Sequence, residues 1–302
     1  TSVILLAQGE PPQYNVRSAA RRFELADDRT DVPAPLARPF YMSDLKGKYA
    51  AIGRSPSRQY YLELADKVQS RLDSRHQVYP AFYGDTPTYL QAIKSALDEG
   101  SRRIVVAHAR VSDPPDPLLA DDFLESLGLN PREVSFTEVG PLWDAGLLPQ
   151  VYVRRVMEAA AQVEDSTEQA VILVIGRGHP QSGEAAMRRM EQEERFNTRV
   201  CEALLKIGFE SDRVKVGWLR HGTPSLTDAL QSLIVDGCKS VFLIPASYVA
   251  DGVNTLRDIP AQLEGLSKRH SIKLVNLGGW NGDDLAAQEI ASRVRALSSV
   301  PA

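Results

Sequence analysis

Two stretches of this chain, residues 83–106 (YGDTPTYLQAIKSALDEGSRRIVV) and residues 220–243 (RHGTPSLTDALQSLIVDGCKSVFL), align with each other without a gap. Pro224 stands 137 positions after Pro87, and all five identities between the stretches share that offset. Each stretch reads as a turn, an amphipathic helix, a glycine and an apolar strand. A repeat of this kind indicates a duplicated structural unit. We therefore expect two lobes, with function in the cleft between them.

The composition is that of a globular protein. A length of 302 residues suffices for two α/β domains, and 43% hydrophobic residues can form a core in each. The 35 basic and 39 acidic residues are interspersed and give a net charge of −4. This pattern predicts neither a nucleic-acid partner nor a polybasic membrane patch. No apolar run approaches the ~20 residues of a membrane span, and the sequence does not indicate an oligomeric state.

The two cysteines, Cys201 and Cys238, stand apart and form no CxxC or other metal-type spacing. Both fall in apolar contexts, so we expect buried free thiols and a reducing compartment, namely the cytoplasm. Two isolated cysteines are too few for an iron–sulfur cluster within one chain. The chain opens directly on an apolar run without a charged segment before it, so no signal peptide is expected.

Short apolar runs alternate with helical patterns along the chain. The runs at 2–7 (SVILLA) and 171–176 (VILVIG) lead straight into loops with glycine and proline, which is typical of buried parallel strands. Further strands are predicted at 77–82, 103–107, 134–139, 214–219, 240–245 and 272–277. Helices are predicted at about 58–73, 87–99, 150–163, 185–207, 224–236, 256–267 and 283–297. This alternation predicts an α/β fold of two flavodoxin-like, doubly wound parallel-sheet lobes, residues 1–148 and 149–302.

Residues 26–48 and 113–122 are polar and proline-rich, so we expect irregular excursions there. In open α/β sheets, the loops at the carboxyl ends of the strands line the ligand crevice. The loops selected by this rule are 8–14, 83–87, 108–114, 177–184, 220–224 and 247–257.

The loop Gly176-Arg177-Gly178-His179-Pro180 directly follows a predicted strand. Its glycines allow close approach of the backbone to a ligand, Arg177 could bind an anion, and His179 could accept a proton. A glycine-lined turn with solvated side chains is the alternative. No GxGxxG spacing leads into a helix, so a nucleotide cofactor is not predicted.

Three of the five histidines, His108, His179 and His221, follow predicted strands. Imidazoles that converge on one cleft would make a site for a late first-row divalent metal plausible. A structural, hydrogen-bonding role is the alternative for each of them. His76 and His270 precede strands, near the opposite edge, and we interpret them as surface residues.

An acidic run follows the glycine-rich loop on a predicted helix, at Glu184, Glu191, Glu193 and Glu194. Such a face could pass cations or accept protons. Charge runs are usually solvated faces, and the neighbouring arginines fit ordinary pairing at i to i+4. We therefore interpret these glutamates as a solvated face.

Several motifs resemble those of ferrochelatases. Residues 49–56 (YAAIGRSP) resemble the family's YxxIGGxSP element, and residues 248–259 (YVADGVNTLRDI) resemble its FVSDHIETLYEID element. The opening VILLAQGEPP and the strand-loop VILVIGRGHP fall in the matching order, and the GRG within the latter is similar to sirohydrochlorin chelatases. The resemblance covers nearly the whole chain. It implies the class II chelatase fold, in which two flavodoxin-like lobes enclose a tetrapyrrole.

The positions that the resemblance marks as catalytic carry other residues. Arg177 stands where ferrochelatases have an essential histidine in an SAHGLP loop, and Asn254 stands where they have a glutamate. Gln8 stands where sirohydrochlorin chelatases have a first-lobe histidine. Arginine, with a pKa above ~12, serves neither as a base nor as a metal ligand, but it pairs well with carboxylates.

The resemblance implies a chelatase, a lyase of heme or siroheme biosynthesis, that inserts a divalent metal substrate into a porphyrin or sirohydrochlorin-type macrocycle. Iron follows from the ferrochelatase likeness, and cobalt or nickel from the sirohydrochlorin one. The expected catalytic residues are His179, His221, Arg177 and Asn254, with His179 and His221 as the metal ligands. The expected tetrapyrrole-binding residues are Gln8, Tyr49, Ser55, Arg177, Arg220 and Tyr248. The alternatives are a degenerate homologue that binds, carries or senses a tetrapyrrole without inserting metal, and a flavodoxin-like module for an unrelated anion.

Overall fold

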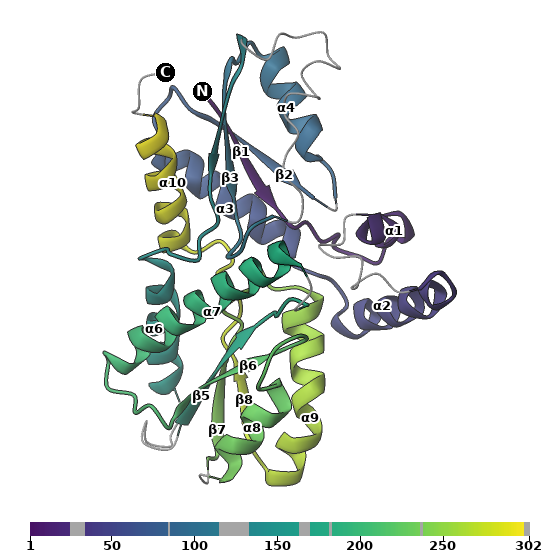
Figure 1. The fold of residues 1–302 in the computed structure, drawn as a ribbon, viewed down its shortest axis with the longest axis vertical. Helices are drawn as coiled ribbons and strands as arrows, with labels where there is room; N and C mark the ends of the chain where they lie inside the picture. The colour runs from purple at the N-terminus through teal and green to yellow at the C-terminus, as the bar shows by residue number, and fades with distance from the viewer. Residues whose placement is uncertain are drawn as a thin grey trace.

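Two four-stranded parallel sheets lie one above the other in an elongated molecule (Figure 1). This computed structural model describes residues 1–24, 34–83, 85–114, 133–162, 170–180, 183–235 and 238–298. The first sheet consists of β1 (Ser2–Ala7), β2 (Gln77–Phe82), β3 (Arg103–His108) and β4 (Ser135–Val139). The second consists of β5 (Ala170–Gly176), β6 (Val214–Trp218), β7 (Ser240–Ile244) and β8 (Lys273–Asn276).

The two sheets have the same topology. Their strand orders are β2-β1-β3-β4 and β6-β5-β7-β8, and every described pairing is parallel. This is the strand order of flavodoxin-like folds. The predicted fold class is therefore confirmed. All eight predicted strands are present, with ends shifted by at most one residue.

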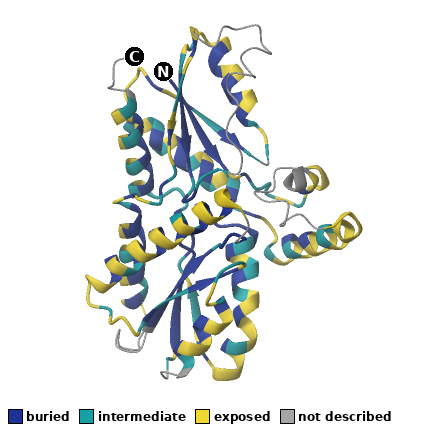
Figure 2. Cartoon of the chain, viewed as in Figure 1, coloured by how far each residue is buried: buried dark blue, intermediate teal, exposed yellow. Residues whose placement is uncertain are grey.

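Helices cover both faces of each sheet. They are α1 (Val16–Glu24), α2 (Arg38–Ile52), α3 (Ser57–Arg71), α4 (Tyr89–Asp98), α6 (Leu148–Ala160), α7 (Glu184–Leu205), α8 (Leu226–Val235), α9 (Ile259–His270) and α10 (Asp284–Ser298). A 3₁₀ turn, η2 (Pro35–Ala37), precedes α2, and a π-helical turn, η4 (Asn254–Asp258), precedes α9. The inner strands β1, β3, β5 and β7 are buried along nearly their whole length, the edge strands β4 and β8 are mostly half-buried or exposed, and the outer helix faces are exposed (Figure 2). No helix among the described residues is long and apolar enough to cross a bilayer.

The repeated block is visible in the helix starts of both lobes. Thr88 caps α4, where its Oγ1 accepts a hydrogen bond from the Gln91 amide at 3.3 Å. Ser225 caps α8 in the same way, accepting from the Asp228 amide at 3.2 Å. Such caps satisfy amides that have no partner within the helix. The helix starts therefore match at the offset predicted from the sequence.

The constant offset of 137 residues does not extend to the strand end that precedes each helix cap. The Phe82 amide donates to the Pro87 carbonyl, and the Trp218 amide donates to the Pro224 carbonyl. Pro224 minus Pro87 gives 137, but Trp218 minus Phe82 gives 136. The second lobe thus has one more residue between strand and cap, so its loop carries an additional side chain near Arg220.

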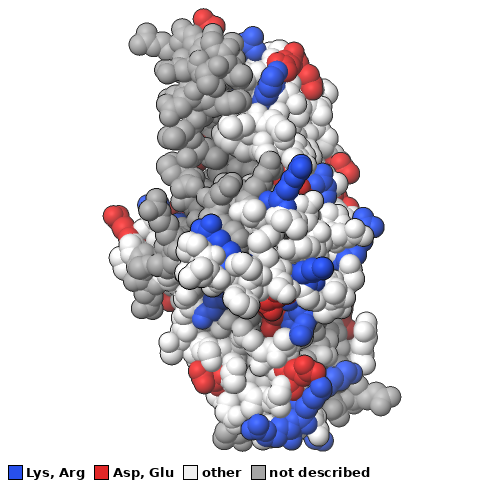
Figure 3. Space-filling view, turned by 90° about the vertical axis from the view of Figure 1, so that its right-hand side faces the viewer, with Lys and Arg blue, Asp and Glu red and all other residues white. Residues whose placement is uncertain are grey.

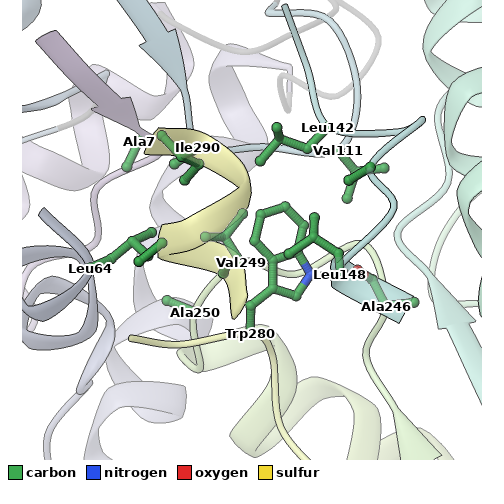
Figure 4. Packing of buried hydrophobic residues seen from close by; sticks show 14 of the residues in the cluster. Ala7, Leu64, Val111, Leu142, Leu148, Ala246, Val249, Ala250, Trp280 and Ile290 are labelled. Atoms are coloured by element: carbon green, nitrogen blue, oxygen red, sulfur yellow. Dashed lines mark hydrogen bonds between the residues drawn. The ribbon is translucent and has the colours of Figure 1, made fainter. Parts of the chain in front are cut away.

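An apolar core runs without interruption from one lobe to the other. Figure 4 shows Trp280 at the junction, with Leu148, Val249 and Ile290 around its ring. Trp280 is completely buried, and its indole N–H donates to the Ala246 carbonyl at 3.3 Å. The lobes are therefore joined by packed side chains and not only by the chain crossing between them.

The last helix returns to the first lobe. α10 packs against α3 and against the edge of the first sheet, and Asp284 at its start pairs with Lys67 and Arg71. The division at residues 148 and 149 stays a prediction, because the C-terminal segment contributes to both halves of the molecule.

Two expectations about irregular or exposed segments are wrong. Within the stretch 26–48, residues 38–48 form most of α2, which begins with a proline in its first turn, where proline is tolerated. Residues 25–33 and 115–132 lie outside the described residues. His76 is not a surface residue, because it is only 7% exposed and its Nδ1 lies 2.7 Å from the Asp73 carboxylate.

Both cysteines are free, as predicted, but half-buried and not fully buried. Burial raises the pKa of the Cys201 thiol to about 11, so this thiol stays protonated near neutral pH. On the face in Figure 3, basic and acidic side chains are interspersed over both lobes, with the densest basic run at the far end of the second lobe. That face carries no single field of one sign.

Candidate functional site

A cavity of about 200 Å³ lies between the lobes, where the carboxyl ends of both sheets meet. Its walls come from the loops after β1, β3, β5, β6 and β7, together with α2, α3, α7 and η4. We call it the main cavity. The sequence-predicted residues that line it are Gln8, Arg177, Arg220, Tyr248 and Asn254.

Two loops in equivalent positions enter the main cavity, one from each lobe. Gln8-Gly9-Glu10 follows β1, and Arg177-Gly178-His179 follows β5. Both central glycines are left-handed, with φ of 72° and 80°, a conformation that favours glycine. A Cβ atom on Gly178 would also lie 1.8 Å from the His221 carbonyl oxygen. The glycine therefore permits the β5 and β6 loops to touch.

Glu193 on α7 lies at the second-lobe wall of the main cavity and is only 2% exposed. Its carboxylate accepts hydrogen bonds from the Arg177 and Gly178 amides, both at 3.1 Å, and from the Ser247 hydroxyl at 3.0 Å. The interpretation of this residue as part of a solvated face is wrong. The other three glutamates of the run are exposed as predicted: Glu184, Glu191 and Glu194.

The position of Glu193 in the helical pattern could have predicted that it is buried. It falls in register with the buried face of α7, three residues from both Met190 and Phe196. A helix presents residues three and four apart on one face, so this glutamate had to point inward.

Burial acts to raise the pKa of Glu193, because it disfavours the charged form. The hydrogen bond and charge of His179, the Gly178 amide and the charge of Arg177 outweigh burial and hold this pKa below its ordinary value. Glu193 is therefore a buried carboxylate that stays ionised at neutral pH.

His179 is 1% exposed, and its Nε2 lies 3.0 Å from Oε1 of Glu193. The same nitrogen lies 3.5 Å from the hydroxyl of Ser112, which belongs to the first lobe and lines the main cavity. His179 itself stands behind that wall. Ser112 lies in the loop 108–114 that the sequence selected as part of the crevice, but its contact with His179 was not predicted, because it depends on how the β3 loop meets α7.

The β3 loop is held against α7 beside this histidine. Asp113 and Gln192 exchange two hydrogen bonds, of 2.7 and 3.0 Å, and Arg188 pairs with the Asp113 carboxylate at 2.6 Å. These contacts cross from the first lobe to the second. They fix Ser112 next to the Glu193–His179 pair.

Glu10 makes the corresponding connection from the first-lobe loop. Its Oε1 accepts hydrogen bonds from the Ser55 hydroxyl at 2.5 Å and from the Val253 amide of the second lobe at 3.0 Å. The phenol of Tyr49 donates to the Pro11 carbonyl at 3.1 Å. Tyr49 and Ser55 are both buried and support this loop, so they lie behind the lining and not in it.

Two arginines stand side by side on the second-lobe wall. The Arg220 amide donates to the Arg177 carbonyl at 3.2 Å, so the ends of β5 and β6 bring both guanidinium groups to the main cavity. Tyr248 lines the same wall and is 8% exposed, and its hydroxyl has no hydrogen-bond partner within the described part of the chain. This wall can bind anionic and hydrogen-bond-accepting groups.

The predicted metal ligands are not assembled into a ligand set. The structure places the His221 carbonyl against Gly178, and His221 is absent from the described lining of the main cavity. Within the described ranges, no group of three or more His, Cys, Asp or Glu residues could hold a metal ion. The roles of His179 and His221 as metal ligands stay predictions.

The sequence is similar to one protein family over almost its full length. The sequence model of the family described as Ferrochelatase matches residues 1–297. A ferrochelatase of Geotalea uraniireducens (strain Rf4) is 23% identical over 226 residues, which cover 72% of this chain and 70% of that protein. A ferrochelatase of Geotalea daltonii is 22% identical over 320 residues and covers 98% of both chains.

Solved chelatase structures share the fold. The sirohydrochlorin chelatase SirB from Bacillus subtilis subspecies spizizenii, in complex with cobalt, aligns with a TM-score of 0.59 at 10% identity, over 99% of this chain and 96% of that one. SirB from Bacillus subtilis with Fe³⁺ gives 0.60 at 12% identity, over 99% and 95%. CbiX, described as the terminal enzyme for biosynthesis of siroheme in denitrifying bacteria, gives 0.52 at 11%, over both whole chains.

Proposed function

This chain belongs to the ferrochelatase family, and we propose that it inserts a divalent metal substrate into a tetrapyrrole bound in the main cavity. The observation that carries the proposal is the buried Glu193–His179 pair at the wall of that cavity. Iron or cobalt is the proposed metal, in keeping with the ferrochelatase relatives and the cobalt and Fe³⁺ complexes of SirB.

Metal insertion requires two pyrrole protons to leave as the metal enters. Glu193 lines the main cavity as an anion, and His179 lies directly behind it. In our proposal the Glu193 carboxylate takes up the proton that leaves the macrocycle, and the imidazole of His179 holds this carboxylate in place through its Nε2–H hydrogen bond. General bases placed in this way typically accelerate a reaction about 10²- to 10⁴-fold.

The same carboxylate also favours the approach of a divalent cation. A negative charge in a mostly buried wall interacts with a cation more strongly than one in water. Ser112 and Ser247 keep this carboxylate and its histidine in place from two sides. Arg177 stands where ferrochelatases have a histidine. In this proposal the histidine that assists proton transfer is His179, two residues later in the same loop.

Arg177 and Arg220 are proposed to bind carboxylate groups of the macrocycle, since arginine pairs with carboxylates in a bidentate manner. Gln8 and Asn254 line the main cavity and would supply neutral hydrogen bonds to the ligand. Because neither titrates near neutral pH, we assign them no proton-transfer step.

A second candidate is a tetrapyrrole-binding protein that inserts no metal. The observation that favours it is the absence, among the residues described, of any group of three His, Cys, Asp or Glu side chains. In that case the arginines and Tyr248 would hold the macrocycle, and the Glu193–His179 pair would be a structural element of the β5 loop.

One experiment separates the two candidates. The purified protein is incubated without oxygen with coproporphyrin, protoporphyrin or sirohydrochlorin plus Fe²⁺ or Co²⁺, and absorbance is followed over time. The proposed function predicts a metal-dependent spectral change faster than the uncatalysed one. It also predicts that His179→Ala removes most of this rate and that His270→Ala, at an exposed histidine, does not.

The outcomes differ clearly. Tight binding of the macrocycle with no metal-dependent change supports the second candidate. A full rate in His179→Ala would remove the assignment of the acceptor pair but leave the chelatase activity. If none of these macrocycles binds, both candidates are wrong.

A further inference from the structure

A cluster of polar side chains lies at the carboxyl end of the first sheet, on the face that α4 covers. It consists of Tyr83 after β2, Tyr89 at the start of α4, His108 at the end of β3 and Glu138 on β4. We call it the first-lobe cluster. Its residues are absent from the described lining of the main cavity, and none of them takes part in the proposed metal insertion.

The second lobe shows that the fold does not need this polar set. The strand registers and the helix starts identify the equivalent residues of the second sheet. These residues are Leu219 for Tyr83, Leu226 for Tyr89, Pro245 for His108 and Asn276 for Glu138. Both leucines are buried in an apolar core. Mainly apolar side chains thus close this end of the second sheet, so the polar set of the first lobe requires another reason.

Two buried polar atoms of the first-lobe cluster have no hydrogen-bond partner within the described ranges. They are Nε2 of His108, whose side chain is 1% exposed, and the hydroxyl of Tyr89, which is 9% exposed. Burial and the nearby charge of Glu138 raise the pKa of Tyr89, so its hydroxyl stays protonated. Buried polar groups without a partner are unfavourable and rare. Two of them next to one carboxylate indicate that a further group binds there.

The spacing of His108 and Glu138 is that of two ligands of one metal ion. Nε2 lies 3.6 Å from Oε2 of Glu138, which is too long for a hydrogen bond. Two bonds of about 2.0–2.2 Å at a tetrahedral angle span about 3.3–3.6 Å. The other ring nitrogen, Nδ1, lies 3.2 Å from the Tyr83 hydroxyl. When Nδ1–H donates to this hydroxyl, the lone pair of Nε2 faces the carboxylate, and a cation between them removes their repulsion.

The donor types select the class of ion. One imidazole nitrogen and one carboxylate suit zinc and its late first-row neighbours, whereas magnesium and calcium prefer oxygen ligands. The Glu138 side chain is 52% exposed, and its interaction with His108 holds its pKa below the ordinary value, so the carboxylate is ionised. An ion can therefore reach the first-lobe cluster from solvent, and water molecules can complete its coordination.

We propose that His108 and Glu138 bind one late first-row divalent ion, such as Zn²⁺ or Co²⁺, with the Tyr83 hydroxyl fixing the imidazole. Metal-bound histidines almost always donate their other ring N–H to a group of this kind. The inference does not depend on the proposed function, because the ion lies outside the main cavity. His108 begins the loop that carries Arg110 and Ser112 to the wall of that cavity, so the ion would fix this loop.

The test counts metal ions in the absence of any tetrapyrrole. Metal-free wild type, His108→Gln and His270→Gln are titrated with Zn²⁺ or Co²⁺ in a calorimeter. We expect His108→Gln to bind one ion fewer than wild type, and His270→Gln, at an exposed histidine, to bind as wild type does. Tyr83→Phe removes only the orienting hydroxyl and is expected to weaken binding about 10- to 100-fold.

A second variant keeps the test independent of folding. Glu138→Asn introduces the residue of the second lobe at a half-exposed side chain, so we expect loss of the same ion with an unchanged thermal midpoint of the metal-free protein. Glu133→Gln, at an exposed glutamate, is the matched control and should keep the ion. Glu193→Gln should keep it too, because Glu193 lies at the main cavity.

Two results would overturn the inference. One is an equal number of bound ions in wild type, His108→Gln and Glu138→Asn. The other is a wild type that binds no ion, which would leave a bridging water molecule as the group between His108 and Glu138.

Discussion

The loops Gln8-Gly9-Glu10 and Arg177-Gly178-His179 occupy the same place in the two lobes and share a left-handed glycine. Their third residues have different tasks. Glu10 reaches across the cleft and accepts a hydrogen bond from the Val253 amide. His179 turns to a carboxylate of its own lobe, Glu193 on α7.

The difference shows that two loops with the same backbone can have different roles. The first-lobe loop holds the lobes together through Glu10, and the second-lobe loop binds a buried carboxylate. In the second lobe, the additional residue before Pro224 places Arg220 beside Arg177. On this account Glu10 serves to hold the lobes together, whereas the charged groups that we place in the chemistry, Glu193, Arg177 and Arg220, come from the second lobe.

The largest effect on the second-lobe loop is expected from removal of the buried carboxylate. Glu193→Ala leaves two amides, Ser247 and His179 without their acceptor. Removal of one partner of a buried ionic group typically costs about 3–5 kcal/mol, so we expect a loss of that size in the free energy of unfolding by urea.

The matched control is Glu194→Ala, one position along α7 and exposed. Substitutions at exposed positions usually change the free energy of unfolding by no more than about 0.5 kcal/mol. Equal effects of the two variants would mean that the carboxylate is not the structural centre of the second-lobe loop.

A second test compares the two glycines directly. Gly178→Ala would force a left-handed alanine and a contact with the His221 carbonyl, whereas a Cβ on Gly9 meets the Phe82 side chain. A left-handed conformation costs an alanine about 1–2 kcal/mol of folding free energy. Crowding around the added Cβ atom costs about 1–3 kcal/mol more. We expect Gly178→Ala to lose more unfolding free energy than Gly9→Ala.

Gly100→Ala supplies the control for conformation alone. It is left-handed, with φ of 89°, but an added Cβ would have no atom within 4 Å. A loss for Gly178→Ala no larger than for Gly100→Ala would show that the β5 and β6 loops do not touch in solution.

A third test uses acid. The pKa of Glu193 is lower in the folded protein than its ordinary value near 4.5, so its charge stabilises the fold above that value, and this contribution is lost as pH falls through the folded pKa. The difference in unfolding free energy between wild type and Glu193→Gln should therefore be largest near neutral pH and should shrink below about pH 4.5. A difference that grew on acidification would contradict the assigned ionisation.

The smallest expected effects come from the two serines that hold the acids of the site. Ser55→Ala removes a donor to Glu10, and Ser247→Ala removes a donor to Glu193. Hydrogen bonds to charged groups contribute about 1.5–3 kcal/mol. We expect losses of unfolding free energy near the lower end of this range, with Ser95→Ala, at an exposed helix position, as the neutral control.

The sequence predicted the sheets well because buried parallel strands are continuous apolar runs with glycine and proline directly after them. It missed α2, which buries only Leu45 and Tyr49 and exposes Phe40, so its apolar period is weak. Repeated helices such as α4 and α8 were predictable because their caps and apolar faces recur together.

Residues that follow a strand could be predicted as lining, and Arg177, Arg220 and Tyr248 do line the main cavity. The inward direction of Glu193 follows from the register of α7 and could have been predicted, whereas its contacts with the β5 loop depend on how the helix packs against that loop. His179 was selected, but its burial behind that carboxylate depends on the same packing. Sequence order identifies the crevice, whereas contacts between elements decide which groups face it.

The most direct test of the account is the initial rate of Co²⁺ insertion into coproporphyrin by wild type, Glu193→Gln and Glu10→Gln. Both variants are isosteric and remove one charge, in the second and the first lobe respectively. We expect a catalysed rate for wild type, a reduction of about 10²- to 10⁴-fold for Glu193→Gln, and a much smaller reduction for Glu10→Gln. A wild-type rate in Glu193→Gln, or wild type that binds the macrocycle tightly without metallating it, would contradict it.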